Sequence, residues 1–167
     1  HYAIRWLKHK AREWNGDITH FGILGSSSGG HVAQLIGMKP HDPQYAAIPL
    51  PEAPHLDATA VYIATRSPIS NPVARRAQAE RKGNKEMMKK SDTFFNPPET
   101  IHDGNPQEIL DRKENVRLLP LLIMQGGLDD NVIPEIQEKF AATYRAAGGD
   151  CQLEIFKDSE HEWTAVP

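Results

Sequence analysis

The chain has 167 residues, 39% of them hydrophobic and 25% charged, with a formal net charge of -3 at pH 7. This balance is typical of one folded domain with a hydrophobic core, and it gives no reason to expect a nucleic acid or an anionic membrane as partner. No apolar run approaches membrane-spanning length, and the single Cys151 excludes an internal disulfide. The compartment stays open, with only a slight preference for a reducing, cytoplasmic one.

The first predicted element is an amphipathic helix. Ala3, Leu7, Ala11 and Trp14 stand three or four residues apart between charged neighbours, and Asn15-Gly16 is a typical helix end. The chain does not begin with methionine, and its first residues already lie within this helical pattern. We therefore expect further sequence upstream.

A strand, a tight turn and a helix are predicted next. Residues 18–24 are apolar and of strand type, and from Ser28 onward apolar residues recur at helical spacing. Between them, Gly25-Ser26-Ser27-Ser28-Gly29 matches G-x-S-x-G, the turn that lifts a serine hydroxyl clear of a sheet. Ser27 is therefore the candidate nucleophile.

Three alternatives to this interpretation stay open at the turn. A frame shifted by one residue, Ser26-x-Ser28-x-Gly30, makes Ser28 the nucleophile, although glycine on both sides suits a crowded turn better. A flexible Gly/Ser linker has the same composition, but does not require an apolar strand before it and an apolar helix after it. A phosphate-binding loop is disfavoured because no Gly-Lys-Ser/Thr or G-x-G-x-x-G is present.

The segment after this helix is predicted to be irregular and to lead into a buried strand. Five prolines between residues 40 and 54 indicate a loop over the surface. Residues 57–65 are apolar and β-branched, as expected of a strand buried on both faces.

Residues 66–116 are polar and interrupted by prolines, and we expect them to form a cap or lid. Within them, residues 74–90 have the pattern of one charged helix, whose basic residues we interpret as a solvated face rather than an anion site. Phe94 and Phe95 are expected to line a pocket under this lid, with ordinary packing as the alternative.

The remaining chain alternates strands and helices. Residues 118–124 predict a buried strand, Pro134 begins a helix that ends at Gly148-Gly149, and residues 152–156 form the last strand. Strands alternating with helices indicate an α/β fold with a parallel sheet, whose sites lie at the carboxyl ends of the strands.

The loops after the last two strands carry the other candidate catalytic residues. A serine nucleophile needs a histidine as general base and a carboxylate that orients the histidine. Asp129 follows the strand at 118–124, with Asp130 as its competitor, and His161 is the only histidine after them. The order Ser27, Asp129, His161 is the one associated with the G-x-S-x-G turn. His31 is interpreted as a packing or surface residue.

No cofactor or metal is expected. His161-Glu162 lacks the second histidine of H-E-x-x-H, and a lone cysteine provides no pair for zinc. Cys151 is interpreted as a packed thiol.

With these motifs the chain resembles the α/β-hydrolase superfamily, and within it the small carboxylesterases related to hormone-sensitive lipase and to feruloyl or acetyl esterases. The segments that carry the resemblance are Gly25–Gly30, Ser67–Pro72, Gln125–Asp129, Val132–Pro134 and Ser159–His161. The resemblance implies an α/β-hydrolase fold, a mostly parallel sheet flanked by helices, over residues 1–167 as a single partial domain.

The resemblance also implies a reaction and a substrate class. Ser27 would cleave a small-molecule carboxylic ester through an acyl-enzyme, and the Ser28 backbone N–H would help to bind the oxyanion. Family members carry earlier strands and a His-Gly-Gly oxyanion loop that this chain lacks, so we expect it to be the C-terminal part of such a domain. A prolyl-oligopeptidase-like peptidase and a noncatalytic binding scaffold remain alternatives. The sequence does not indicate an oligomeric state.

Overall fold

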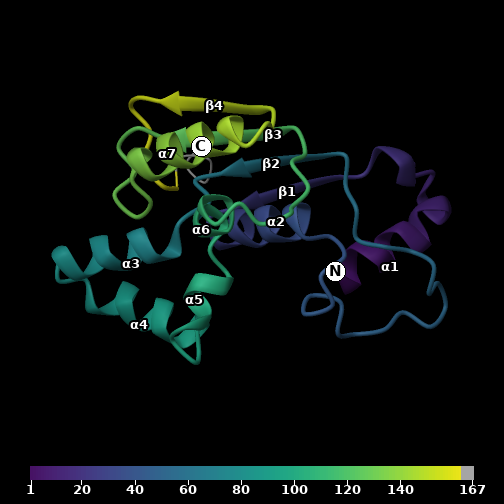
Figure 1. The fold of residues 1–167 in the computed structure, drawn as a ribbon. Coiled ribbons are helices and arrows are strands. Elements are labelled where there is room, and N and C mark those ends of the chain that lie inside the picture. Colours follow the sequence, from purple (N-terminus) through teal and green to yellow (C-terminus); the bar gives the residue numbers. More distant parts are fainter. Residues whose placement is uncertain (163–167) are drawn as a thin grey trace.

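The computed structural model describes residues 1–162, arranged as one parallel sheet with helices around it (Figure 1). The strands are β1 (Gly22–Ser26), β2 (Tyr62–Arg66), β3 (Leu121–Gly126) and β4 (Cys151–Phe156). The α-helices are α1 (Tyr2–Lys10), α2 (Ser28–Met38), α3 (Pro72–Arg81), α4 (Lys85–Phe94), α5 (Thr100–Asp103), α6 (Pro106–Asp111) and α7 (Pro134–Ala146). Two short 3-10 helices, η1 (Ala11–Trp14) and η2 (Ile18–His20), lie between α1 and β1. None of the helices in residues 1–162 has the length and apolar character needed to cross a membrane.

The four strands stand side by side in the order in which they occur in the chain, β1-β2-β3-β4, and every neighbouring pair is parallel. In register, Ile63 of β2 lies beside Ile23 of β1 and Leu121 of β3. The predicted α/β class with a parallel sheet is confirmed. All four carboxyl ends consequently meet at one edge, which brings together loops that are far apart in the sequence.

The hydrophobic core lies between one face of the sheet and three helices, α2, α6 and α7 (Figure 1). Ile63 and Ile123 project from the sheet into this core, where Ile109 of α6 and Phe140 and Tyr144 of α7 meet them, all almost fully buried. Apolar residues three and four apart on α7 predicted this packed face correctly, because one face of a helix at that spacing turns toward the sheet.

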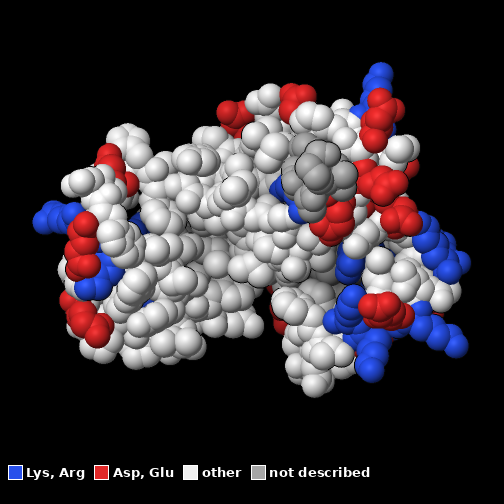
Figure 2. Space-filling view, turned by 180° about the vertical axis from the view of Figure 1, so that it is seen from behind, with Lys and Arg blue, Asp and Glu red and all other residues white. Residues whose placement is uncertain are grey.

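The other face of the sheet is more open than the sequence predicted. The apolar run of residues 57–65 favoured burial of β2 on both faces, yet Tyr62 of β2 is 50% exposed, and Leu24 of the neighbouring β1 is 78% exposed. Figure 2, viewed from behind, shows a broad area without charged side chains across the middle of the molecule. The prediction was wrong at the start of β2, because α2, α6 and α7 all cover the opposite face of the sheet.

The N-terminal helix also turns a different face inward. α1 buries Ile4 and Lys8, while the predicted apolar face leaves Leu7 39% and Trp14 57% exposed. Lys8 is held by its ammonium group, which lies 3.2 Å from an Asp57 carboxylate oxygen. The Lys8 side chain therefore packs inward because a carboxylate accepts a hydrogen bond from the ammonium group at its end. The spacing of apolar residues alone does not reveal such a partner.

Two strands begin later than predicted for the same local reason. The Asp17 side chain accepts a hydrogen bond from the Thr19 N–H at 2.8 Å, and Asp57 does the same for Thr59 at 3.0 Å. Each aspartate thus holds a turn, and the turn competes with an extended strand. As a result β1 and β2 start at residues 22 and 62, not 18 and 57.

The single charged helix predicted at residues 74–90 is two helices. Gly83 has φ 66°, and the Asn84 side chain accepts the Met87 N–H, which ends α3 and begins α4. A glycine in the left-handed region followed by an asparagine N-cap is a common helix boundary.

The prolines between residues 40 and 54 correctly predicted an irregular segment between α2 and β2, because residues 39–61 contain no helix or strand.

Residues 66–116, the predicted lid, contain two kinds of structure. α3, α4 and α5 extend beyond the carboxyl edge of the sheet, at the lower left of Figure 1. By contrast, Ile109 and Leu110 of α6 belong to the main core. The part of the segment that extends away from the main core is therefore α3, α4 and α5.

Candidate active site

Ser27 forms the turn between β1 and α2. Its backbone has φ 51° and ψ -116°, a conformation that a residue with a side chain adopts only where its surroundings hold it. The Ser27 N–H donates to the Arg66 carbonyl at 2.8 Å, and its own carbonyl accepts the His31 N–H at 3.1 Å and the Ile69 N–H at 3.3 Å. These bonds tie the turn to α2 and to the end of β2, at the carboxyl edge of the sheet.

The glycines around Ser27 differ in whether a side chain would fit at their positions. A Cβ on Gly25 would lie 2.3 Å from the Gly29 carbonyl oxygen, and one on Gly30 would lie 2.7 Å from Pro68 Cβ. A Cβ on Gly29 would meet no heavy atom within 4 Å. Steric crowding therefore requires glycine at positions 25 and 30, whereas the motif glycine at 29 faces open space.

We expect Gly25→Ala to destabilise the protein by about 1–3 kcal/mol, because the new methyl group collides with backbone that cannot move aside. Gly29→Ala is the matched control and should change the free energy of unfolding by less than about 0.5 kcal/mol. Urea unfolding of both variants measures the difference. Equal losses in the two variants would contradict this account of the turn.

The structure brings the three candidate residues together. Asp129 follows β3 and His161 follows β4, so both lie at the edge where Ser27 stands. His161 Nε2 is 3.0 Å from Ser27 Oγ, and His161 Nδ1 is 2.8 Å from Asp129 Oδ2. If Nδ1 carries the proton of the neutral imidazole, it donates to the carboxylate and leaves Nε2 free to accept from the serine hydroxyl.

Asp129, not Asp130, faces the histidine. One Asp129 oxygen accepts the N–H groups of Asn131 at 3.0 Å and Val132 at 2.8 Å, and the other accepts Gln125 Nε2 at 3.1 Å. These bonds fix the carboxylate in a buried position, whereas Asp130 is exposed. The geometry thus favours Asp129 over Asp130 as the partner of His161.

Two opposing effects act on the pKa of Asp129. Burial by itself would raise the pKa, but hydrogen bonds from His161 and the Val132 N–H outweigh burial and lower it on balance. Asp129 is therefore ionised at neutral pH. Its negative charge favours the tautomer of His161 in which Nδ1 carries the proton.

Neither Ser28, the alternative nucleophile, nor His31, the other nearby histidine, takes part in the contacts among Ser27, His161 and Asp129 within residues 1–162. Ser28 is the first residue of α2, and within residues 1–162 its hydroxyl makes no hydrogen bond to His161.

His31 is buried, and its Nε2 contacts the Gly104 carbonyl oxygen at 2.6 Å. Burial lowers the pKa of His31, so it packs as a neutral residue. Of the packing and surface roles that the sequence left open for His31, the structure shows packing.

A cavity of about 340 Å³ opens in front of Ser27 and His161. Helices α3 and α4 supply its far wall, and Phe94 and Phe95 line it, as the sequence predicted. The remaining wall residues include Ile69, Pro72, Arg75, Lys90 and Asn131. The space is large enough for a small organic molecule and has both apolar and charged walls.

Cys151 lies apart from this cavity, at the amino end of β4, where it is buried in the main core. Burial raises the pKa of the Cys151 thiol to about 11, which keeps it protonated and unreactive at neutral pH. It is a packed thiol, as predicted. Within residues 1–162, no group of three His, Cys, Asp or Glu side chains is arranged to hold a metal ion.

Comparison with known proteins assigns the chain to a family. A model of the BD-FAE family matches residues 1–143. The chain belongs to the BD-FAE family. Esterase LipC of Mycobacterium tuberculosis (strain ATCC 25618 / H37Rv) is 28% identical over 148 residues, which are 86% of this chain and 34% of LipC. The probable carboxylic ester hydrolase LipM of the same organism is 37% identical over 43 residues, 26% of this chain and 10% of LipM.

Solved esterase structures share the fold of this BD-FAE chain. Propionate-bound Est2 of Thermogutta terrifontis is 23% identical, with a TM-score of 0.63 over 95% of this chain and 52% of that one. An acetyl ester-xyloside bifunctional hydrolase from Caldicellulosiruptor lactoaceticus is 21% identical, with a TM-score of 0.66 over 98% of this chain and 60% of that one. The predicted α/β-hydrolase fold is confirmed. The chain spans about half the length of Est2 and a third of LipC.

One residue at the site of this BD-FAE family chain was missed by the sequence analysis. Arg66, the last residue of β2, donates from Nη1 to the His161 carbonyl at 2.7 Å and from Nη2 to Ser26 Oγ. It thereby connects the residue before Ser27 to the loop that carries His161. The available signal was an arginine at the carboxyl end of a predicted buried strand, where charge is uncommon and site residues gather.

Proposed function

We propose that this chain carries the nucleophile, base and acid of a carboxylesterase-type serine hydrolase. The observation that supports it best is the continuous hydrogen-bonded series Ser27 Oγ, His161, Asp129, in which neither distance exceeds 3.0 Å. A serine hydroxyl becomes a useful nucleophile only when a base and an orienting group are placed in this way. The names of the relatives LipC and LipM favour an ester as the substrate.

In the proposed reaction, Ser27 Oγ attacks the carbonyl carbon of the ester while His161 Nε2 accepts the hydroxyl proton. The tetrahedral intermediate then collapses, and His161 gives the proton to the leaving alkoxide, which departs as an alcohol. Water attacks the acyl-enzyme by the same sequence, so that the acid is released and Ser27 regains its proton. Asp129 stays ionised and stabilises the imidazolium formed in each half-reaction.

The Ser28 N–H is our candidate for one donor of the oxyanion hole. Ser28 begins α2, and the first N–H groups of a helix have no acceptor within it. They also form the positive end of the helix dipole, which favours a developing negative charge. A single oxyanion donor typically contributes about 10²–10³-fold to kcat.

The cavity supports small-molecule esters as substrates, with α3 and α4 as the lid that residues 66–116 contribute. Phe94 and Phe95 offer apolar contact, and the space of about 340 Å³ next to Ser27 suits a short acyl or alcohol group. We therefore place hydrolysis of compact esters ahead of peptide cleavage.

Labelling with a fluorophosphonate followed by peptide mass mapping tests the proposal on the full gene product. We expect the label on Ser27, because phosphonylation requires an activated serine, and no label in Ser27→Ala or His161→Ala. Ser28→Ala, which keeps its backbone N–H, is the matched control and should label normally. A label on Ser28 would move the nucleophile by one residue, and a folded protein without any label would leave a noncatalytic binding scaffold.

A further inference from the structure

Arg75 is a charged wall residue to which the proposed reaction gives no role. It projects from α3 into the cavity in front of Ser27 and His161. Its guanidinium donates from Nε to Asn131 Oδ1 at 3.0 Å, and Nη2 contacts the same oxygen. A neutral amide thus holds two of the three nitrogens, while Nη1 has no hydrogen-bond acceptor among residues 1–162.

The other charges of the cavity wall each have a partner of opposite sign. Lys90 Nζ lies 2.7 Å from a carboxylate oxygen of Glu86, and Glu162 lies 3.9 Å from Arg66. Arg75 pairs with no carboxylate within 4.0 Å in the described part of the chain. Among residues 1–162, no carboxylate is in direct contact with this positive charge of the wall.

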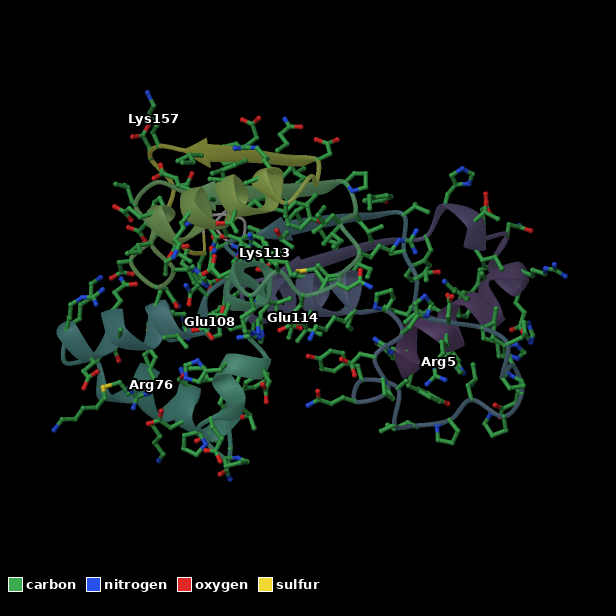
Figure 3. The ribbon with its side chains drawn as sticks, viewed as in Figure 1. Arg5, Arg76, Glu108, Lys113, Glu114 and Lys157 are labelled. Atoms are coloured by element: carbon green, nitrogen blue, oxygen red, sulfur yellow. The ribbon has the colours of Figure 1, made fainter. Side chains whose placement is uncertain are left out.

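The neighbouring arginine shows how different this arrangement is. Arg76 lies between α3 and α4 (Figure 3), where its Nε donates to Asp92 Oδ1 at 2.6 Å. Arg76 fits the interpretation of the basic run as an ordinary surface because it pairs with a carboxylate, whereas Arg75 faces the cavity and bonds to a neutral amide. The two side chains point in different directions because adjacent residues on a helix of 3.6 residues per turn lie about 100° apart.

Arg75 remains a cation in this setting. Burial lowers the pKa of Arg75 and the negative charge of Asp129 acts against that, yet a guanidinium stays protonated at neutral pH. An unpaired, partly desolvated guanidinium attracts a carboxylate more strongly than a solvated one does, because water screens the charge less. Its planar donors also match the two oxygens of a carboxylate.

We propose that Arg75 binds a carboxylate carried by the substrate, so that the site prefers esters with an anionic group near the ester bond over neutral esters. The proposal rests on the proposed function, since it names the substrate class of the same site. Phe94 and Pro72, on the walls of the same cavity, offer apolar contact to the rest of such a molecule.

The proposal is tested with two pairs of esters that differ in charge but little in size. Monobutyl succinate against butyl pentanoate places the carboxylate on the acyl side, and carboxymethyl butyrate against propyl butyrate places it on the alcohol side. A pH-stat measures kcat and KM of the full gene product for each. We expect the wild type to prefer the anionic member of at least one pair through a lower KM.

Arg75→Gln should reduce that preference by about 10–100-fold, the usual range for losing a hydrogen bond to a charged group. Glutamine retains an N–H for Asn131, and Arg75→Lys, which keeps the charge, should restore much of the preference. Arg81→Gln, on an exposed position of the same helix, is the matched control and should leave the preference unchanged. The ratio is informative because the loss of a purely structural role of Arg75 would lower the activity on both members of a pair equally.

Two results would overturn the inference: no preference in the wild type, or an unchanged ratio in Arg75→Gln, which includes an equal loss for both members of a pair. These outcomes are distinct from failure of the proposed function. If the protein hydrolyses the neutral esters with the ratio unaltered, only the assignment of Arg75 is rejected. If it hydrolyses no ester and takes no fluorophosphonate label, the esterase proposal itself is rejected.

Discussion

Replacing His161 by alanine should lower kcat/KM for a hydrolysed ester by roughly 10⁴-fold or more, without unfolding the protein. The reason is the position of Nε2, 3.0 Å from Ser27 Oγ, where the imidazole is the only general base in hydrogen-bond contact with the hydroxyl among residues 1–162. Without it, Ser27 must lose its proton to water, and the leaving alkoxide must take one from water.

Kinetics on an ester panel, with circular dichroism to confirm folding, provide the measurement. Ser27→Ala should lose about as much activity as His161→Ala, and the double variant scarcely more, because the residues act as one unit. His41→Ala, an exposed histidine in the proline-rich loop, is the matched control and should retain wild-type activity. Additive losses in the double variant would argue that Ser27 and His161 act separately.

The second large effect is expected from Asp129→Asn, with a loss in kcat of about 10⁴-fold. The substitution keeps the size of the side chain and its oxygen for the Asn131 and Val132 N–H groups, so the turn after β3 should stay folded. It removes the negative charge beside His161 Nδ1 and with it the preference for the productive tautomer.

Asp130→Asn distinguishes this electrostatic role of Asp129 from a general effect of removing one negative charge from the turn. Asp130 is exposed and adjacent in sequence, so its substitution should change kcat by less than about threefold. The comparison uses steady-state kinetics and the rate of fluorophosphonate labelling in the same samples. If Asp130→Asn were the more damaging change, the acid would have been assigned to the wrong aspartate.

Much of the fold follows from local sequence. The period of apolar residues correctly predicted α7, and the alternation of strands with helices predicted a parallel sheet whose carboxyl ends meet at one edge. The errors are local as well. Asp17 and Asp57 hold turns where strands were expected, and Gly83-Asn84 divides a helix that was predicted to be continuous.

The order of the candidate residues Ser27, Asp129 and His161 was likewise visible in the sequence, since each follows a strand. Proximity was not. The hydrogen bonds that join them span 134 and 32 positions of the chain, and only strand order and register place such loops side by side. The choice of Ser27 over Ser28 and of Asp129 over Asp130 likewise depends on which side chain points toward His161.

The sequence by itself thus determined the residue types, the class of fold and the end of the sheet where chemistry is expected, because periodicity and turn motifs are local properties. Tertiary structure alone decided the direction of each side chain. It buried Lys8 against Asp57, linked Arg66 to His161 and turned Arg75 into the cavity. Long polar side chains take the direction in which a partner lies, and that partner is set by the packing of distant elements.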